Sequence, residues 1–466
     1  MCGVFGITGH PEASKITYLG LHALQHRGQE SAGIVSALDR GESARFRSHL
    51  GVGLVADVFP PEKMERLQGD MAIGHVRYST SGGTDVRNTQ PIRVETRHGP
   101  LAVSHNGNLT NTSKIRADLE HDGAIFSSRT DTELFVHLLT RARPPRIQDR
   151  IRDAVAQSQG AYSFIIMDQD SMIGVRDPQG IRPLVIGELN GAYIFTSESC
   201  ALDLLEAKFV REVEPGEMVT IDRDQNMQSE RLVHAPNAQE RSCIFELVYF
   251  ARPNSHVFDR DVCEMRHALG KQLAIESPVE ADIVIPVPDS GVPSAIGFAE
   301  QAGITFRHGL LRSHYVGRTF IEPSQSIRHF GVKLKLSAVR SIIRGQRVIV
   351  VDDSLVRGTT SRKIVHMLRQ AGAKEVHLRI SSPPTSHPCF YGIDTPTKEE
   401  LIASSHSVEE IRQHVTADSL AYLSPNGLHQ AVGDEFGPNR RMCNACFTGE
   451  YDAGVPSGPP RLHVVD

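Results

Sequence analysis

The sequence has no surplus of positive charge and no long apolar run. Its 50 Lys and Arg residues face 55 Asp and Glu residues, which gives a formal net charge of −5. That balance argues against a general nucleic-acid binder, although a local basic site remains compatible with it. The longest apolar runs, such as residues 348–351, are strand-sized and far below the ~20 residues that cross a bilayer. The first residues lack a basic region followed by an apolar core, so we expect no secretory signal, no membrane contact and a cytoplasmic protein.

Cysteine is sparse as well. The seven cysteines are an odd number spread over 466 residues, which argues against a disulfide framework. In a reducing compartment, the cysteines late in the chain instead suggest metal or cluster ligation. At roughly 150 residues per domain, the length predicts two large domains or three small ones.

The first half of the chain has short apolar strands separated by Gly, Asn and Asp turns. Helical patches at 132–140 and 147–157 interrupt these strands. The strands are expected at 51–55, 71–74, 101–104, 163–167 and 192–195. Strands grouped apart from helices predict a layered α+β domain, which we place at residues 2–235.

The pattern changes from about residue 280. Buried strands are expected at 283–287, 348–351 and 375–380, with helices beginning at 294 and spanning 361–371. This alternation predicts an α/β domain with a parallel sheet and crossover helices. The polar stretch at 235–241 is the expected boundary, so the second domain is placed at residues 242–466.

Cys2 directly follows the initiator methionine, and its small side chain permits removal of Met1. The new terminus would carry a thiol and a free α-amine on one residue. The amine titrates at about 7.7–8.0 and the thiol at about 8.5, so the amine is able to serve as the thiol's base. Position two by itself is equally compatible with a buried structural cysteine.

Further motifs accompany Cys2 in a fixed order. They read CGVFG at 2–6, HRGQESAGI at 26–34, GHVRYST at 74–80, HNGNL at 105–109 and TDTE at 130–133. Together they resemble the N-terminal-nucleophile glutaminase domain of glutamine amidotransferases, which implies a layered αββα fold over about half of the chain.

The resemblance assigns a role to each matched residue. Cys2 would attack the side-chain amide of glutamine and pass through a glutamyl thioester. Asn106 and Gly107 would form an oxyanion hole, whose donors are typically worth ~3–4 kcal/mol each. Arg77 would bind the α-carboxylate of glutamine, and Asp131 its α-ammonium. Each alone has a simpler interpretation: a hairpin turn for Asn-Gly, a solvated strand face for the arginine, and a helix N-cap for the aspartate.

A second constellation follows the strand at 348–351. Two adjacent carboxylates end the strand, and a hydroxyl-rich loop with one glycine leads into a helix. Backbone N–H groups, hydroxyls and the helix N-terminus favour a phosphate, whereas the carboxylates suit the vicinal hydroxyls of a ribose. The stretch 348–361 resembles the phosphoribosyl-pyrophosphate (PRPP) motif of type I phosphoribosyltransferases; a plain strand-to-loop cap is the alternative. The resemblance implies PRPP contacts at Asp352, Asp353, Ser354, Arg357, Gly358, Thr359, Thr360 and Ser361.

Two further segments resemble parts of the same family. The loop PVPDSGVP at 286–293 resembles the pyrophosphate-side loop, which implies that Ser290 joins Asp352 and Asp353 around Mg²⁺. The segment 314–335 resembles the mobile catalytic loop and implies that Arg318, Lys333 and Lys335 bind pyrophosphate; a solvated basic loop is the alternative. Ser337-Ala338 replaces the family's usual Asn-Pro and leaves the contacts near Lys335 open.

Four cysteines form a third constellation. Cys443 and Cys446 are a C-x₂-C pair, and Cys243 and Cys389 bring the number of thiolates to four, enough for zinc or an iron–sulfur cluster. Their flanks, SCIFE at 242–246, PCFYGID at 388–394 and CNACFTG at 443–449, resemble the [4Fe–4S]-bearing class of amidophosphoribosyltransferases. Amide transfer needs no electron carrier, so the implied cluster is structural. Zinc or free thiols remain alternatives. Cys200 and Cys263 lack such flanks and are expected in the core.

Residues 2–449 as a whole resemble the amidophosphoribosyltransferase family. This implies an enzyme that converts glutamine, PRPP and water into 5-phosphoribosylamine, glutamate and pyrophosphate, the first committed step of purine synthesis. Uncharged ammonia would pass between the two sites through a sequestered passage. The resemblance also implies a homotetramer and feedback inhibition by AMP and GMP.

Three other classes of protein share some of these motifs. A sugar-phosphate aminotransferase would share the glutaminase half but lack Asp352-Asp353 and the following loop. A non-enzymatic PRPP-binding regulator would have no use for Cys2, Arg77 and Asp131. An iron–sulfur redox protein would need the four cysteines alone.

Overall fold

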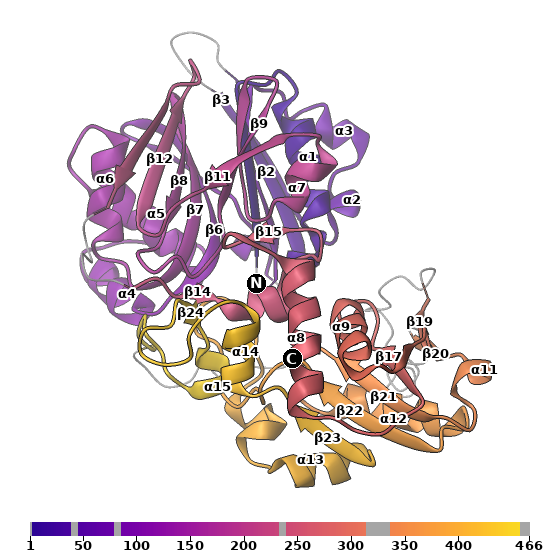
Figure 1. Cartoon of the computed structure of the whole chain (residues 1–466). Helices are drawn as coiled ribbons and strands as arrows, with labels where there is room; N and C mark the ends of the chain where they lie inside the picture. Colours follow the sequence, from indigo (N-terminus) through magenta and orange to yellow (C-terminus); the bar gives the residue numbers. More distant parts are fainter. Residues whose placement is uncertain (1, 39–44, 79–84, 233–238, 314–335, 457–466) are drawn as a thin grey trace.

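The computed structural model describes residues 2–38, 45–78, 85–232, 239–313 and 336–456 (Figure 1). The first half of the chain is built on two antiparallel sheets, and the second on a parallel sheet with helices. None of the helices in these ranges has the length and hydropathy needed to traverse a bilayer.

The first sheet has the strand order β11-β9-β10-β1-β4-β2-β3. Its strands are β1 (Gly3–Thr8), β2 (Ser31–Leu38), β3 (Arg45–Val52), β4 (Met71–Arg77), β9 (Val185–Leu189), β10 (Ala192–Thr196) and β11 (Lys208–Glu212). β1 is central and pairs with β4 and β10, and its first residue, Gly3, pairs with Val76 of β4. The strand predicted at 51–55 is partly wrong: β3 ends at Val52, and Val55 begins the short helix α2 (Val55–Val58).

The second sheet has the order β13-β12-β8-β7-β6-β5. Its strands are β5 (Ile92–Thr96), β6 (Gly99–Leu109), β7 (Gly160–Met167), β8 (Ser171–Arg176), β12 (Glu217–Asp222) and β13 (Met227–Arg231). Apolar side chains of both sheets, among them Val4, Ile165 and Phe195, form one buried cluster between them.

Helices cover the outer face of each sheet. α1 (Ala13–Ala23), α2, α3 (Pro61–Met64) and α7 (Cys200–Leu204) lie with the first sheet, and α4 (Thr112–His121), α5 (Asp131–Arg141) and α6 (Ile147–Val155) with the second. The apolar faces of α1 and of α4–α6 fill separate clusters against their sheets. The predicted αββα layering is confirmed.

The second half contains a five-stranded parallel sheet in the order β18-β17-β21-β22-β23. The strands are β17 (Ile283–Pro286), β18 (Thr305–Phe306), β21 (Arg347–Asp352), β22 (Glu375–Ile380) and β23 (Ser419–Tyr422). The helices that accompany it are α9 (Val292–Ala302), α12 (Thr359–Gln370) and α13 (Val408–Val415). The predicted parallel sheet is confirmed, with helices that begin two residues earlier than expected.

Short elements join the two halves. β14 (Ser242–Cys243) pairs in parallel with β24 (Met442–Cys443), so residues 200 positions apart lie side by side. The π-helix η3 (Glu246–Phe250) follows β14, and the long helix α8 (Val262–Glu276) leads from the junction toward the parallel sheet (Figure 1). The boundary at residues 235–241 stays a prediction, because residues 233–238 lie outside the described ranges.

Smaller elements complete the described chain. They are η1 (Gln25–Arg27), η2 (Val86–Asn88), β15 (His256–Val257), β16 (Arg260–Asp261), β19 (Leu310–Arg312), β20 (Leu336–Ala338), α11 (Arg340–Ile343), η4 (Lys398–Glu400), η5 (Ile402–Ser404), α14 (Pro425–Ala431) and α15 (Ala445–Thr448). Ser337-Ala338 lies in β20, which pairs with β19.

Candidate functional site

Cys2 is buried immediately before β1. Its side chain is 7 % exposed, and its Sγ lies 3.8 Å from the carbonyl oxygen of Tyr78. The Cys2 carbonyl accepts a hydrogen bond from Arg27 Nε at 3.0 Å. Because β1 continues at Gly3 between two strands, the nucleophile predicted from the sequence is held on a rigid element.

Asn106 lies on β6 of the facing sheet and is completely buried. Its amide Nδ2 and Oδ1 have no hydrogen-bond partner among the described residues. A buried amide without partners costs free energy, so an unused donor and acceptor here indicate a group that binds a ligand. The next residue, Gly107, has φ +152°, and a Cβ there would lie 2.1 Å from the carbonyl oxygen of Ala161. Glycine is therefore required beside the predicted oxyanion-hole amide.

Arg77 and Asp131 reach the same region from different elements. Arg77 ends β4, is 4 % exposed, and has its Nη1 3.9 Å from Glu30 Oε2. Asp131 opens α5 and accepts a hydrogen bond from the backbone N–H of Leu109 at 3.0 Å, just past the oxyanion-hole pair on β6. The fold thus brings a buried cation and a buried carboxylate to the part of the molecule that holds Asn106.

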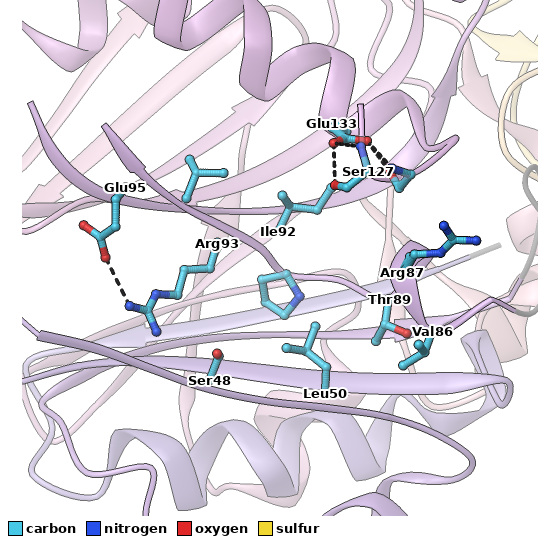
Figure 2. Close-up of a pocket in the computed structure, with 13 residues that line it drawn as sticks. Ser48, Leu50, Val86, Arg87, Thr89, Ile92, Arg93, Glu95, Ser127 and Glu133 are labelled. Atoms are coloured by element: carbon cyan, nitrogen blue, oxygen red, sulfur yellow. Dashed lines mark hydrogen bonds and ion pairs between the residues drawn. The ribbon is translucent and has the colours of Figure 1, made fainter. Parts of the chain in front are cut away.

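The N-terminus of α5 is fixed by a polar scaffold. The N-cap is Thr130, whose hydroxyl accepts from Glu133 N, so Asp131 is not the cap. The Glu133 carboxylate accepts from the backbone and hydroxyl groups of Ser127 and Ser128 at 2.6–2.8 Å. This scaffold lines a cavity of about 590 Å³ beside β3 and β5 (Figure 2). The cavity contains no predicted site residue, but its wall positions Asp131.

His105 was not given a role in the sequence analysis, although it stands in the HNGNL motif. Its Nδ1 lies 3.4 Å from Asp131 Oδ1. Burial disfavours the charged form of both groups, but their mutual attraction outweighs it, so the pKa of His105 is raised and that of Asp131 lowered. A negative charge on Cys2 would also raise the pKa of His105. The motif marked the residue, but its partner depends on how β6 and α5 pack.

Asp352 and Asp353 end β21 at the carboxyl edge of the parallel sheet. The two oxygens of Asp353 accept hydrogen bonds from the hydroxyls of Ser290 and Ser354. Burial and mutual repulsion raise the pKa of Asp352; burial raises that of Asp353, although its serine partners oppose the shift. The structure therefore joins the three predicted Mg²⁺ ligands, and a cation here would relieve the buried negative charge.

The loop after these carboxylates leads into the start of α12. Gly358 precedes the helix with φ +73°, a left-handed conformation that favours glycine. Thr359, Thr360 and Ser361 form the first turn, where backbone N–H groups are free of helical partners. Arg357 Nη2 pairs with Glu400 Oε1 at 3.0 Å on the exposed side of the loop. The free backbone N–H groups at this helix start suit the phosphate that the sequence predicts here.

Three predicted PRPP-binding cations, Arg318, Lys333 and Lys335, lie in 314–335, outside the described residues. Their roles stay predictions.

The four motif cysteines gather at the junction of the two halves. β14–β24 pairing sets Cys243 opposite Cys443, and Cys389 Sγ accepts from the backbone N–H of Tyr391 at 3.3 Å. Cys243 and Cys443 belong to one buried apolar cluster, and Cys389 and Cys446 pack against it. Burial raises the pKa of the Cys446 thiol, and the other three cysteines raise it further. Even so, within the described residues no three His, Cys, Asp or Glu side chains form a ready metal site. Cys200 is buried as expected, but the expectation for Cys263 was wrong, because it lies on an exposed turn of α8.

The cysteine-bearing loop packs against β6, the strand that holds the predicted oxyanion-hole residues. Asn108 Nδ2 donates to the carbonyl oxygen of Phe390 at 2.9 Å. Gly392 packs closely on Gly107: a Cβ on residue 392 would lie 2.9 Å from the Gly107 carbonyl carbon. The loop of the second half thus lies beside Gly107 and Asn108 of the candidate site.

Comparison with known proteins agrees with this geometry. Residues 75–204 match the model of the glutamine amidotransferase domain, and residues 269–381 match that of the phosphoribosyl transferase domain. The chain is 54% identical over 451 residues to amidophosphoribosyltransferase 2, chloroplastic, of Arabidopsis thaliana, covering 97% of this chain and 79% of that protein. It is 51% identical over 465 residues to amidophosphoribosyltransferase of Bacillus subtilis, covering 99% and 96%.

A solved structure described as the allosteric regulatory enzyme of purine biosynthesis superposes with a TM-score of 0.91, at 51% identity over 98% of both chains. A second, the B. subtilis glutamine PRPP amidotransferase complexed with ADP and GMP, also has a TM-score of 0.91, at 51% identity over 97% of this chain and 98% of that one.

Proposed function

Because the chain belongs to the amidophosphoribosyltransferase family, we propose that it releases ammonia from glutamine at Cys2 and transfers it to PRPP. The products are glutamate, 5-phosphoribosylamine and pyrophosphate, as in the first committed step of purine synthesis. The alternative of a sugar-phosphate aminotransferase is disfavoured by the second match, to a phosphoribosyl transferase domain, which includes the carboxylate pair of β21.

In the glutaminase half, the thiolate of Cys2 attacks the amide carbon of glutamine. The carbon–nitrogen bond of the tetrahedral species then breaks as the nitrogen takes up the proton that the thiol gave up, so ammonia leaves and a glutamyl thioester remains. Water hydrolyses this thioester to glutamate and restores the thiol. Asn106 Nδ2 and the backbone N–H of Gly107 stabilise the oxyanion. Arg77 binds the α-carboxylate and Asp131 the α-ammonium. The unpartnered, buried amide of Asn106 supports this assignment most directly, because oxyanion formation supplies its missing acceptor.

In the second half, Asp352 and Asp353 bind the ribose hydroxyls of PRPP, and residues 354–361 bind its 5-phosphate. Mg²⁺ fits Ser290, Asp352 and Asp353, since these oxygen ligands are already adjacent and the carboxylate pair has raised pKa values. When bound, Mg²⁺ would neutralise charge on the pyrophosphate leaving group. Arg318, Lys333 and Lys335 are proposed to add positive charge at the same group.

A [4Fe–4S] cluster fits the four neighbouring cysteines Cys243, Cys389, Cys443 and Cys446. The donor set supplies four thiolates, as such clusters require, and zinc is the alternative for the same set. The backbone N–H of Tyr391 already points at the sulfur of Cys389, as hydrogen bonds to cluster sulfurs do. The group would supply a covalent clamp between β14, the 389–392 loop and α15.

Three further properties follow from the family rather than from the site. The B. subtilis relative solved in complex with ADP and GMP supports the binding of purine nucleotides, and AMP and GMP are the proposed feedback inhibitors. A homotetramer is proposed on the family resemblance. A cytoplasmic location stays a prediction, and the Arabidopsis relative is named chloroplastic.

The test uses Cys2→Ala in the full-length holoenzyme. Glutamine-dependent synthesis of phosphoribosylamine should disappear, because the nucleophile is lost, whereas synthesis from added ammonia and PRPP should survive. Cys263→Ala, a substitution on exposed α8, serves as the matched control. Loss of the ammonia-dependent reaction in the Cys2 variant would contradict two separable sites.

A further inference from the structure

Arg27 connects the nucleophile to a buried cluster of charges. It closes the 3₁₀-helix η1, and its side chain is completely buried. Nε donates to the carbonyl oxygen of Cys2 at 3.0 Å, while Nη2 and Nη1 donate to the two oxygens of Glu246 at 2.7 and 3.1 Å. Nη1 also donates to Glu198. One planar guanidinium therefore holds the Cys2 backbone and two buried carboxylates at once.

The second half of the chain supplies the main partner. Glu246 opens η3, three residues after Cys243, and its side chain is fully buried. Phe250, at the other end of η3, places its ring 5.0 Å from the Arg27 guanidinium carbon. Arg27 is thus held by a carboxylate and an aromatic ring from one helical turn that does not belong to the glutaminase sheets.

Arg182 links Glu246 to the loop that bears Cys389. Its Oε1 accepts from Arg182 Nη1 at 3.3 Å, and Arg182 Nε donates to the carbonyl oxygen of Tyr391 at 2.7 Å. Arg182 Nη2 lies 3.9 Å from Cys389 Sγ. A continuous chain of charge-assisted hydrogen bonds therefore runs from the Cys2 backbone to the cysteine-bearing loop.

We propose that the Arg27–Glu246 pair positions Cys2 for attack on glutamine. The second half of the chain would then contribute, through Glu246, to the orientation of the nucleophile. The bidentate contact fixes the plane of the guanidinium, and that plane fixes the direction of its Nε–H toward Cys2. Arg27 and Glu246 are positioning residues, since neither is placed against substrate. The inference rests on the proposed glutaminase activity at Cys2.

The test replaces Glu246 by Gln, which keeps the side-chain shape and removes the charge. The Gln amide presents a donor to the Arg27 donors, so the bidentate contact is lost. Misplacement of a reacting group by about 1 Å lowers the rate of a reaction by about 100-fold, so kcat for glutamine hydrolysis should fall by about that factor. The glutamine KM should stay within about twofold of wild type, because Arg77 and Asp131 bind the substrate.

Phe250→Leu is the milder second variant, since it keeps every ion pair and removes the ring beside Arg27. The lost cation–π contact predicts a fall of about two- to fivefold in kcat. Glu212→Gln is the matched control: Glu212 also pairs with a buried arginine, Arg176, at 3.3 Å and accepts from Phe258 N of the second half, but it does not touch Cys2. Its kcat for glutamine should equal that of wild type.

The readouts separate positioning from folding and from the proposed function. Ammonia-dependent synthesis should be unchanged in all three variants. An unchanged glutamine kcat in Glu246→Gln, a rise in KM alone, or equal losses of the glutamine and ammonia reactions would each overturn the inference. If Glu246→Gln does not fold, an unchanged kcat in Phe250→Leu overturns it instead. A wild-type protein without glutamine-dependent synthesis would instead show that the proposed function is wrong.

Discussion

Asn106 shows at the scale of one residue how a function opposes stability. Its buried amide has no partner among the described residues, which is unfavourable for folding by about 1–3 kcal/mol. Asn106→Leu should therefore leave the free energy of unfolding equal or higher, while glutamine hydrolysis falls by about 10²–10³. Urea unfolding and steady-state glutaminase assays measure the two effects.

Asn88 provides the contrast for that measurement. It is also buried, but its Oδ1 accepts a hydrogen bond from Arg129 N at 3.3 Å. Asn88→Leu should lower the free energy of unfolding by about 1–3 kcal/mol because a satisfied amide is removed. Equal destabilisation by both substitutions would show that Asn106 is satisfied in solution.

The His105–Asp131 pair predicts a pH dependence of stability. The raised pKa of His105 gives a contribution that is complete below its unfolded pKa of about 6.5 and is lost as pH rises through the folded pKa. The lowered pKa of Asp131 gives a contribution that is complete above its unfolded value of about 3.9 and is lost as pH falls through the folded pKa. The pair should therefore stabilise most between about pH 4 and 6.5.

His105→Gln checks that window. Near pH 5.5 it should lower the free energy of unfolding by about 1.5–3 kcal/mol, and the difference from wild type should shrink above pH 7. Denaturant unfolding across pH 4–9 measures it, with His121→Gln on the exposed end of α4 as control. A difference that grows with rising pH would contradict the assigned charges.

At the scale of an element, the start of α12 combines a strained conformation with the proposed phosphate site. Gly358 has φ +73°, and a Cβ there would meet Ile402 at 3.3 Å. Gly358→Ala should cost about 1–2 kcal/mol of stability and raise the PRPP KM in the ammonia-dependent reaction. Gly345→Ala is the control, since Gly345 has φ +76° and open space around it. The Gly345 variant should lose similar stability but keep the PRPP KM of wild type. An equal rise of the PRPP KM in both variants would contradict a phosphate site at the start of α12.

The whole molecule depends on the junction where β14 meets β24. A cluster there would join cysteines from three distant segments of the chain, so Cys443→Ser should lose most bound iron and acid-labile sulfide and melt at a lower temperature. Cys263→Ser on exposed α8 should keep both. Iron and sulfide analysis with thermal unfolding measures the effect. Zinc in place of iron in the purified wild type would exclude the cluster.

The sequence alone determined the classes of structure and the chemistry of the sites. The strand at 283–287 and the helices at 132–140 and 147–157 were predictable because apolar periodicity and turn residues act locally. Cys2, Asn106, Asp352 and Gly358 were predictable because each stands in a contiguous motif. The sequence also marked the four cysteines, since their flanks are local.

Only the tertiary structure decided which residues face one another. Nothing local links Arg27 to Glu246, 219 positions apart, or His105 to Asp131, because such pairs form only where separate strands and helices pack. The same holds for Gly392 against Gly107, and for the exposure of Cys263, which depends on which side of α8 is covered. Motifs specify reactive groups along the chain, but burial and long-range pairing set their charge states and orientations.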